Sequence, residues 1–266
     1  VVVSNATLHN EDEINRKDIR IGDTVTIQRA GDVIPQVLSV DKSKRGKNSK
    51  KFIFPTKCLC GAITKKETSI TTKKIDAVRR CLKGYECDFT AKEKLKHIVS
   101  KEAFDIEGLG KKVIDNFWNL NLIKTPADIF RLDYFKIRKL EGWGELSIKN
   151  LQNAIDKSKN IMLDKFIYSI GIRHIGQENA KIIGHFFKKS KYFSELFYEK
   201  KRAKILQNLE DLNGIGDTQI RSIDDFFSNK KNSEIIQSLM LVLNIKDMQK
   251  ISQNGVFINK NIMFTG

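Results

Sequence analysis

The chain has 266 residues, 40% of them hydrophobic, and a formal net charge of +16. This length predicts about two domains, and the basic excess predicts a polyanionic partner, with nucleic acid as the first candidate and an acidic membrane surface as the second. No apolar run approaches the roughly 20 residues that cross a bilayer and the first residues lack a secretion signal, so we expect a soluble cytoplasmic protein with no membrane partner.

Residues 1–55 are predicted to form a small all-β barrel. Polar and apolar residues alternate from Thr24 to Gln28, directly after the turn-forming pair Gly22-Asp23. The stretch 41–51 then carries six basic residues against one acid. It is predicted to be a solvated loop, and two interpretations stay open for it: a loop that only aids solubility, or one that touches phosphate.

All four cysteines lie in one polar stretch, residues 56–90, at Cys58, Cys60, Cys81 and Cys87. Disulfides are not expected in the cytosol, so the two nearby pairs predict a tetrahedral zinc site with four cysteine ligands. A metal would supply the folding free energy that this threonine-rich stretch cannot gain from a core. A single residue separates Cys58 from Cys60, fewer than in the usual zinc knuckle, so reduced free thiols remain the alternative.

A glycine-centred pattern recurs four times between Phe104 and Phe227. The copies align on Gly110, Gly144, Gly176 and Gly216. These glycines are 34, 32 and 40 residues apart, and apolar residues stand four and one before them and four and seven after them. The later offsets form one stripe of a helix, while closely spaced glycines force a turn before it. Residues 91–232 are therefore predicted to be an all-α domain of four helix-hairpin-helix repeats.

The hairpin glycines are the predicted phosphate contacts. Because glycine lacks Cβ, its backbone N–H groups can closely approach a ligand, and the next helix adds a positive dipole. A single copy is explained equally well as a simple connector, but four copies in register favour phosphate binding. The predicted DNA-binding glycines are Gly108, Gly110, Gly142, Gly144, Gly176, Gly214 and Gly216. His174 replaces the first glycine of the third copy, so phosphate is expected to approach that hairpin less closely.

Residues 233–253 are predicted to be a linker. The residues after them, 254–266, have the character of a strand-rich unit at its beginning. The chain also lacks an initiating methionine. We therefore expect it to be a fragment of a longer protein.

Several stretches resemble the C-terminal half of bacterial NAD-dependent DNA ligase. VSNATLHNEDEI over 3–14 and DIRIGDTVTIQRAGDVIPQV over 18–37 are similar to the oligonucleotide-binding fold (OB-fold) of that family. RRCLKGYECDFTAKEKLKHIVSKEAFDIEGLG over 79–110 is similar to its second zinc half-site and first hairpin. The final residues, NIMFTG, resemble the first strand of a BRCT domain.

The resemblance implies a monomeric, nucleoid-associated protein that grips nicked double-stranded DNA, independently of sequence, for phosphodiester bond formation in replication and repair. By position in the motif, Arg29 would face the DNA beside the nick, and Val33 and Ile34 would shape that surface. Zinc would be structural. NAD⁺ and Mg²⁺ would serve the full-length enzyme only and would not bind this chain.

The resemblance also implies that the catalytic lysine belongs to a KxDG motif in an upstream nucleotidyltransferase domain, a partner within the same enzyme. The closest string here, Lys74-Ile75-Asp76-Ala77, lacks the glycine. No catalytic residue is therefore expected in this chain, and the fragment alone is expected to be inactive. Two other interpretations stay open: a stand-alone helix-hairpin-helix repair or scaffold protein, and an RNA-binding translation factor, which fits the charge but not the four hairpins.

Overall fold

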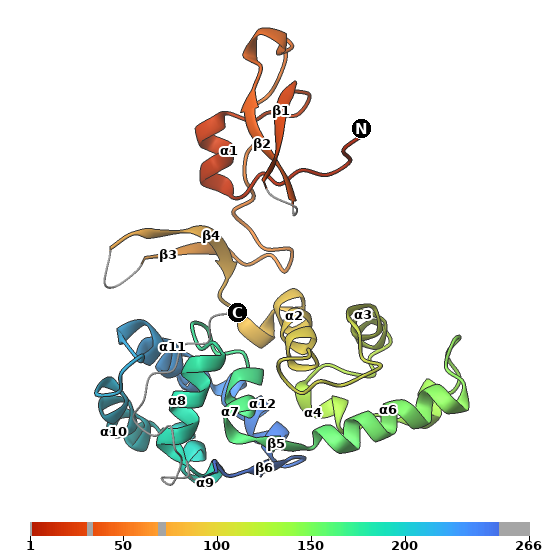
Figure 1. Cartoon of the computed structure of the whole chain (residues 1–266), viewed down its shortest axis with the longest axis vertical. Coiled ribbons are helices and arrows are strands. Elements are labelled where there is room, and N and C mark those ends of the chain that lie inside the picture. Colours follow the sequence, from red (N-terminus) through yellow and green to blue (C-terminus); the bar gives the residue numbers. More distant parts are fainter. Residues whose placement is uncertain (1, 31–33, 69–72, 250–266) are drawn as a thin grey trace, which may run out of the picture. The chain divides into compact units, whose positions relative to one another are not determined.

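The computed structural model describes residues 2–30, 34–68 and 73–249 (Figure 1). The chain divides into two compact units, Val1–Cys87 and Asp88–Gly266. Among the described residues, no helix combines the length and apolar character that a bilayer crossing requires.

The first unit begins with a helix beside a two-stranded antiparallel sheet. The helix α1 spans Glu11–Lys17, and the strands are β1, Val25–Ala30, and β2, Ile34–Val40. Asn10 caps α1 by accepting a hydrogen bond from the Glu13 amide. Among the described residues of this part, Ile14 and Val37 are buried apolar side chains. Figure 1 shows α1 beside the two strands.

The predicted closed barrel is not seen in the described residues, whose sheet here has two strands, and α1 corrects the all-β expectation. Directly after β2, residues 41–51 are polar and basic, a composition that disfavours a further half-buried strand there. It forms instead a short 3₁₀ turn, η1, over Lys42–Lys44. Arg45 fastens this turn, because its guanidinium donates to the Asp23 carboxylate at 2.8 Å and to the Asp18 carboxylate at 2.6 Å.

The cysteine-containing part forms a second antiparallel ribbon. Its strands are β3, Thr64–Thr68, and β4, Ile75–Cys81, followed by the 3₁₀ turn η2 over Gly84–Glu86. Arg79 of β4 donates a 2.8 Å hydrogen bond to the Glu11 carboxylate. One face of the ribbon is thereby tied to α1.

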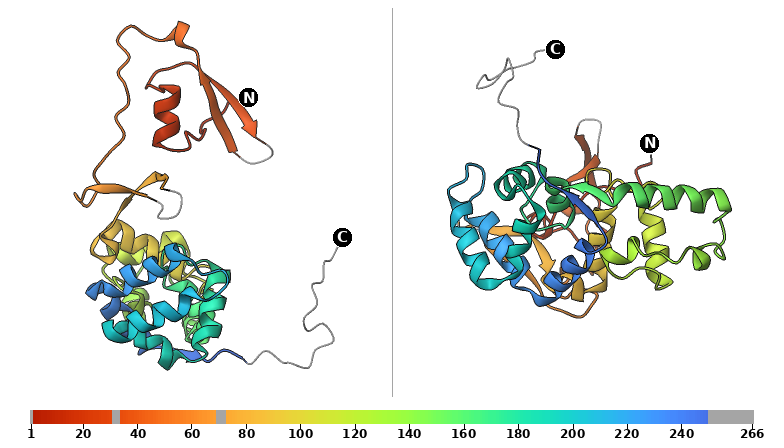
Figure 2. Two further views of the ribbon diagram at one scale, coloured as in Figure 1. Left: turned by 90° about the vertical axis from the view of Figure 1, so that its left-hand side faces the viewer. Right: turned by 90° about the horizontal axis from the view of Figure 1, so that it is seen from below.

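The second unit is helical. Its first helices are α2 (Asp88–Ile98), α3 (Lys111–Asn119), α4 (Pro126–Ile129), α5 (Tyr134–Ile137), α6 (Glu145–Ser158) and α7 (Leu163–Ser169). The later ones are α8 (Gln177–Phe187), α9 (Ser190–Phe193), η3 (Ser194–Phe197), α10 (Glu199–Glu210), α11 (Asp217–Ser228) and α12 (Lys230–Met240). The long helix α6 runs along one edge of this unit (Figure 2).

The core of the helical unit combines residues at the repeat offsets, such as the buried Phe117 and Ile183, with aromatic residues that the offsets do not include. Phe193 lies at its centre, with edge-to-face ring contacts to Phe166, Phe187 and Phe227 at centroid distances of 5.9, 5.4 and 5.7 Å. Such contacts add to the stability gained by burial alone.

Residues 233–246, within the stretch predicted as a linker, are packed into this unit. Ile235, Ile236 and Leu239 of α12 are buried, because their spacing places them on one helical face. The strand β6 (Asn244–Lys246) then pairs in parallel with β5 (Asn160–Met162). The predicted start of a BRCT domain at 254–266 lies outside the described residues.

Candidate nucleic-acid interface and metal centre

Four hairpins join pairs of helices, and they share one backbone conformation. The first corner of each has a positive φ: Gly108 (86°), Gly142 (82°), His174 (60°) and Gly214 (92°). Two residues later comes an extended helix N-cap, in turn Gly110, Gly144, Gly176 and Gly216. The residue between the corner and the cap points inward: Leu109, Ile175 and Ile215 are buried, and Trp143 is half-buried. The predicted hairpins are therefore present in register.

The corners and caps themselves are exposed. A Cβ atom placed on Gly110, Gly142, Gly144 or Gly176 would meet no atom within 4 Å. The first amides of a helix have no intrahelical acceptor, so each hairpin presents donors to open space. This arrangement can bind an oxyanion such as a phosphate.

The first helical turn differs between the hairpins. α3 begins with two exposed basic residues, Lys111 and Lys112, and has no acid in its first turn. The helices after the other three hairpins carry Glu145, Glu178 and Asp217 in that position. An acidic side chain in the first turn competes with an incoming anion for the positive end of the helix dipole. Of the four helix N-termini described, that of α3 therefore offers the most favourable electrostatics for binding an anion.

The fourth hairpin has an acceptor of its own. The Gly216 amide donates a 3.2 Å hydrogen bond to Gln219 Oε1, forming a capping box. A phosphate arriving at this amide must displace the glutamine side chain. The repeat pattern alone gave no sign of this difference, although a glutamine three residues after a cap is a known capping signal.

In the third hairpin, His174 makes the turn that glycine makes in the other copies. Asn179 Nδ2 donates a 3.1 Å hydrogen bond to the main-chain oxygen of His174. The backbone follows the common path, so a looser approach of phosphate at this hairpin stays a prediction.

The first hairpin packs against the helix of the second and the second against that of the first, while the fourth packs against the helix of the third. In the first pair, a Cβ atom on Gly108 would lie 3.6 Å from Leu151 Cδ1 of α6, while the Trp143 ring of the second hairpin packs against Phe117 of α3 in a tilted contact at a centroid distance of 5.3 Å. In the second pair, Gly214 lies against α8, where a Cβ atom would come within 2.9 Å of Ile182 Cδ1. Each pair thus fixes two helix N-termini relative to each other.

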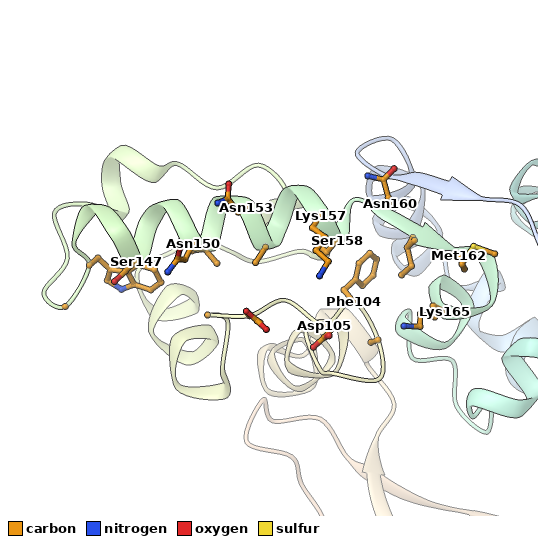
Figure 3. A pocket seen from close by; sticks show the side chains of 18 residues that line it. Phe104, Asp105, Ser147, Asn150, Asn153, Lys157, Ser158, Asn160, Met162 and Lys165 are labelled. Atoms are coloured by element: carbon orange, nitrogen blue, oxygen red, sulfur yellow. The ribbon is translucent and has the colours of Figure 1, made fainter.

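A cleft of about 1100 Å³ lies between the first hairpin and α6. Figure 3 shows Ser147, Asn150 and Lys157 along α6 on one side and Asp105 on the other. Its charged residues balance, because Lys157 and Lys165 face Asp105 and Glu107. The lining therefore does not select an anion, in contrast to the hairpin amides at its rim.

Two side chains of α2 cover the C-terminal end of α7. Lys94 Nζ donates a 3.0 Å hydrogen bond to the Gly171 oxygen, and His97 Nε2 lies 3.1 Å from the Tyr168 oxygen. Lys94 also lies over the Phe226 ring, 5.5 Å from its centroid. Burial lowers the pKa of Lys94 to about 8. These contacts join the first hairpin pair to the second.

Two of the predicted contact residues of the first unit, Arg29 and Ile34, lie on β1 and β2. Arg29 belongs to β1, where its backbone is opposite Pro35, and Ile34 begins β2 with an exposed side chain. Val33 lies outside the described residues. Their contact with DNA stays a prediction.

The four cysteines converge on one point. Their sulfur atoms all lie within 4.8 Å of one another, and Cys58–Cys87 and Cys60–Cys81 are each 3.7 Å apart. A tetrahedral site with metal–sulfur bonds of about 2.3 Å needs sulfur–sulfur edges of roughly 3.8 Å. The narrow spacing of Cys58 and Cys60 is accommodated by a turn in which the Gly61 amide donates to the Cys58 oxygen at 2.8 Å. The residues present fit a tetrahedral metal ion.

Comparisons with known proteins agree with this architecture. The NAD-dependent DNA ligase OB-fold domain matches residues 1–49, and the helix-hairpin-helix motif matches residues 165–236. A DNA ligase of Pelagibacter ubique (strain HTCC1062) is 57% identical over 268 residues, which cover 100% of this chain and 39% of that protein. A DNA ligase of Xanthobacter autotrophicus is 41% identical over 281 residues, which cover 100% of this chain and 39% of that protein. A DNA ligase of Wolbachia pipientis wMel is 43% identical over 273 residues, which cover 100% of this chain and 40% of that protein.

An OB-fold segment followed by tandem helix-hairpin-helix units defines a multidomain protein of the DNA-binding class. The chain spans about two-fifths of the length of the curated relatives described above. Over its whole length the chain is similar to DNA ligases, and its first residues match the OB-fold domain of the NAD-dependent DNA ligases, the family that its motifs resemble.

Proposed function

We propose that this chain is the DNA-gripping portion, from the C-terminal half, of an NAD-dependent DNA ligase. It holds nicked duplex DNA for phosphodiester bond formation in replication and repair. The observation that carries the proposal is the set of four exposed hairpins with one shared backbone conformation. Because main-chain amides contact phosphate and not bases, the grip is independent of sequence and weakens steeply with salt.

In this proposal the domains divide the work. Residues 1–55 belong to an oligonucleotide-binding fold that presents Arg29, Val33 and Ile34 to the DNA beside the nick. Residues 56–90 are the zinc segment, and 91–232 hold the four hairpins. A linker and the start of a BRCT domain follow, the linker beginning after the packed residues of α12 and β6.

We further propose that Cys58, Cys60, Cys81 and Cys87 hold a structural zinc ion as thiolates. The convergence of the four sulfur atoms supports this site. The metal would fix the β3–β4 ribbon, whose side chains are mostly exposed or half-buried. Metal analysis of the purified chain should give one zinc per molecule, and a value near zero with four reactive thiols would contradict the site.

NAD⁺, Mg²⁺ and the KxDG lysine are assigned to the upstream nucleotidyltransferase domain of the same cytoplasmic, monomeric enzyme. This chain alone would then seal no nick. Assays on ordinary and pre-adenylated nicks, with and without the upstream portion, check this assignment. Sealing of an ordinary nick by the isolated chain would overturn it.

The hairpin grip is tested by placing side chains where a phosphate would sit. Gly110 and Gly144 have ordinary φ values and open space, so G110L/G144L should fold and yet block both amides. We expect binding of a nicked duplex, measured by fluorescence anisotropy, to weaken more than about tenfold, since hydrogen bonds to charged groups contribute about 1.5–3 kcal/mol.

The matched control is N119L, which adds a leucine at the exposed C-terminal end of α3. Helix C-termini present carbonyl groups, which repel phosphate, so this variant should bind like the unchanged chain. Equal affinity of G110L/G144L and N119L would refute the hairpin grip.

A further inference from the structure

The β3–β4 ribbon places like charges directly opposite each other on both of its faces. Its register pairs Lys65 with Arg80 and Lys66 with Arg79. Like charges at directly opposed positions of an antiparallel pair are destabilising. Each pair therefore needs an anionic partner, and the two faces differ in where that partner is found.

The pair Lys66 and Arg79 is neutralised from within the chain. Lys66 Nζ lies 3.2 Å from the Glu11 carboxylate and 2.6 Å from that of Asp12, and Arg79 Nε lies 2.8 Å from Glu11. The hydrogen bond from Arg79 lowers the pKa of Glu11 below its ordinary value. This face of the ribbon is thus fully matched by α1.

The pair Lys65 and Arg80 lies on the opposite face and is exposed. Within the described residues Lys65 forms no ion pair, and the carboxylate nearest to Arg80, that of Asp76, is 3.8 Å away. Arg80 keeps 47% of its side-chain surface exposed. Two adjacent positive charges therefore face outward, and of the two only Arg80 has a described carboxylate within 4 Å, that of Asp76.

Apolar side chains flank this basic pair on the same face. Strand alternation places Ile63 and Leu82 on one side of it and Val78 on the other. These three residues are 68%, 54% and 43% exposed. We name the set Ile63, Lys65, Val78, Arg80 and Leu82 the ribbon face.

We propose that the ribbon face binds the sugar-phosphate backbone of duplex DNA, in addition to the hairpins. Lys65 and Arg80 would each contact a phosphate, while the flanking aliphatic groups would cover the apolar sides of the sugars. Charge complementarity favours a polyanion of this kind, because the one ion pair of the two cations in the described chain is the 3.8 Å contact of Arg80 with Asp76, and Lys65 has none there. The inference rests on the proposed function, since it names a second surface for the same DNA.

The test is a salt titration of nicked-duplex binding by the full chain. K65Q/R80Q should reduce the magnitude of the negative slope of log affinity against log salt by about 2, because each phosphate contact contributes roughly 0.9 to that magnitude. Its affinity at 0.1 M salt should fall by more than about tenfold. K65R/R80K, which keeps both charges, should behave like the unchanged chain.

The matched control is K200Q/K204Q, which removes two exposed charges from α10. It should leave the slope within about 0.5 of the original. The ribbon-face proposal would be overturned if K65Q/R80Q keeps the slope of the unchanged chain, or if K200Q/K204Q reduces the slope as much as K65Q/R80Q does. Either result would leave the proposed hairpin grip in place. Failure of the unchanged chain to bind nicked DNA would instead remove the proposed function itself. Equal thermal midpoints for all variants show that folding does not cause the difference.

Discussion

Asn179 donates a 3.1 Å hydrogen bond from its side-chain amide to the main-chain oxygen of His174, five residues before it. His174 is the non-glycine corner among the four described hairpins, and its φ of 60° lies in the left-handed region. Histidine enters this region more easily than most residues but at a cost. The bond from Asn179 helps to hold the corner in the conformation that glycine reaches freely.

His174→Gly should change the free energy of unfolding by less than about 1 kcal/mol relative to the unchanged chain. The relief of the left-handed strain is offset by the greater conformational entropy that glycine gives the unfolded chain. His174→Val should lower that free energy by about 2 kcal/mol relative to His174→Gly, since a β-branched residue is poorly tolerated at positive φ. Urea unfolding followed by tryptophan fluorescence measures both. Equal stability of the two variants would show that the corner is not strained.

Gly214 and Gly142 have nearly the same positive φ but different surroundings. Gly142→Ala should lower the free energy of unfolding by about 1–2 kcal/mol, through backbone strain alone, because its Cβ would meet no atom within 4 Å. Gly214→Ala should cost about 1–2 kcal/mol more, because its Cβ would come within 2.9 Å of Ile182 Cδ1. Ile182→Val removes that carbon, so the extra cost should shrink in the I182V/G214A double variant. A double-mutant cycle by urea unfolding would contradict the pairing of the hairpins if it shows no coupling.

The repeat offsets predicted the hairpins because each depends on a few residues close in sequence. Leu109 and Ile215 had to be buried once the helices on either side packed together. The pairing of the hairpins did not follow, because the contact of Gly214 with Ile182 depends on how two helices meet in space. Glu11–Lys17 was predicted as β structure although Asn10 and Glu13 form a helix start signal. Residues 233–253 were likewise predicted as a linker, because α12 follows the last repeat and has no glycine-centred pattern of its own.

Acid should loosen the first unit through Asp18. Hydrogen bonds from Arg45 and Arg20 lower the pKa of Asp18 to about 2, below its ordinary value near 3.9. A lowered carboxyl pKa stabilises the fold above the unfolded value, so this contribution is lost as pH falls from about 4 to 2. The protection factor of the buried Val37 amide against hydrogen exchange, which corrects for the intrinsic pH dependence of exchange, should fall over that range relative to pH 5.

Arg45→Met should remove most of this pH dependence, since the main partner of Asp18 is gone. Lys44→Met is the control, because Lys44 makes an exposed 3.4 Å contact with Asp41 in the same basic stretch. Its exchange profile should follow that of the unchanged chain. Identical profiles for all three proteins would mean that the Arg45 cluster does not fasten the basic stretch.

Lys94 should give the helical unit a stability that rises in alkaline solution. Burial lowers the pKa of Lys94 to about 8, whereas an unfolded lysine titrates near 10.4. Between these values the unfolded chain binds more protons than the folded one, so the free energy of unfolding increases with pH, by on the order of 3 kcal/mol at most. Lys94→Met has no proton to lose, and its urea midpoint should lack this rise between pH 8 and 10. Parallel pH profiles for the two proteins would show that the lysine is not desolvated against Gly171 and Phe226.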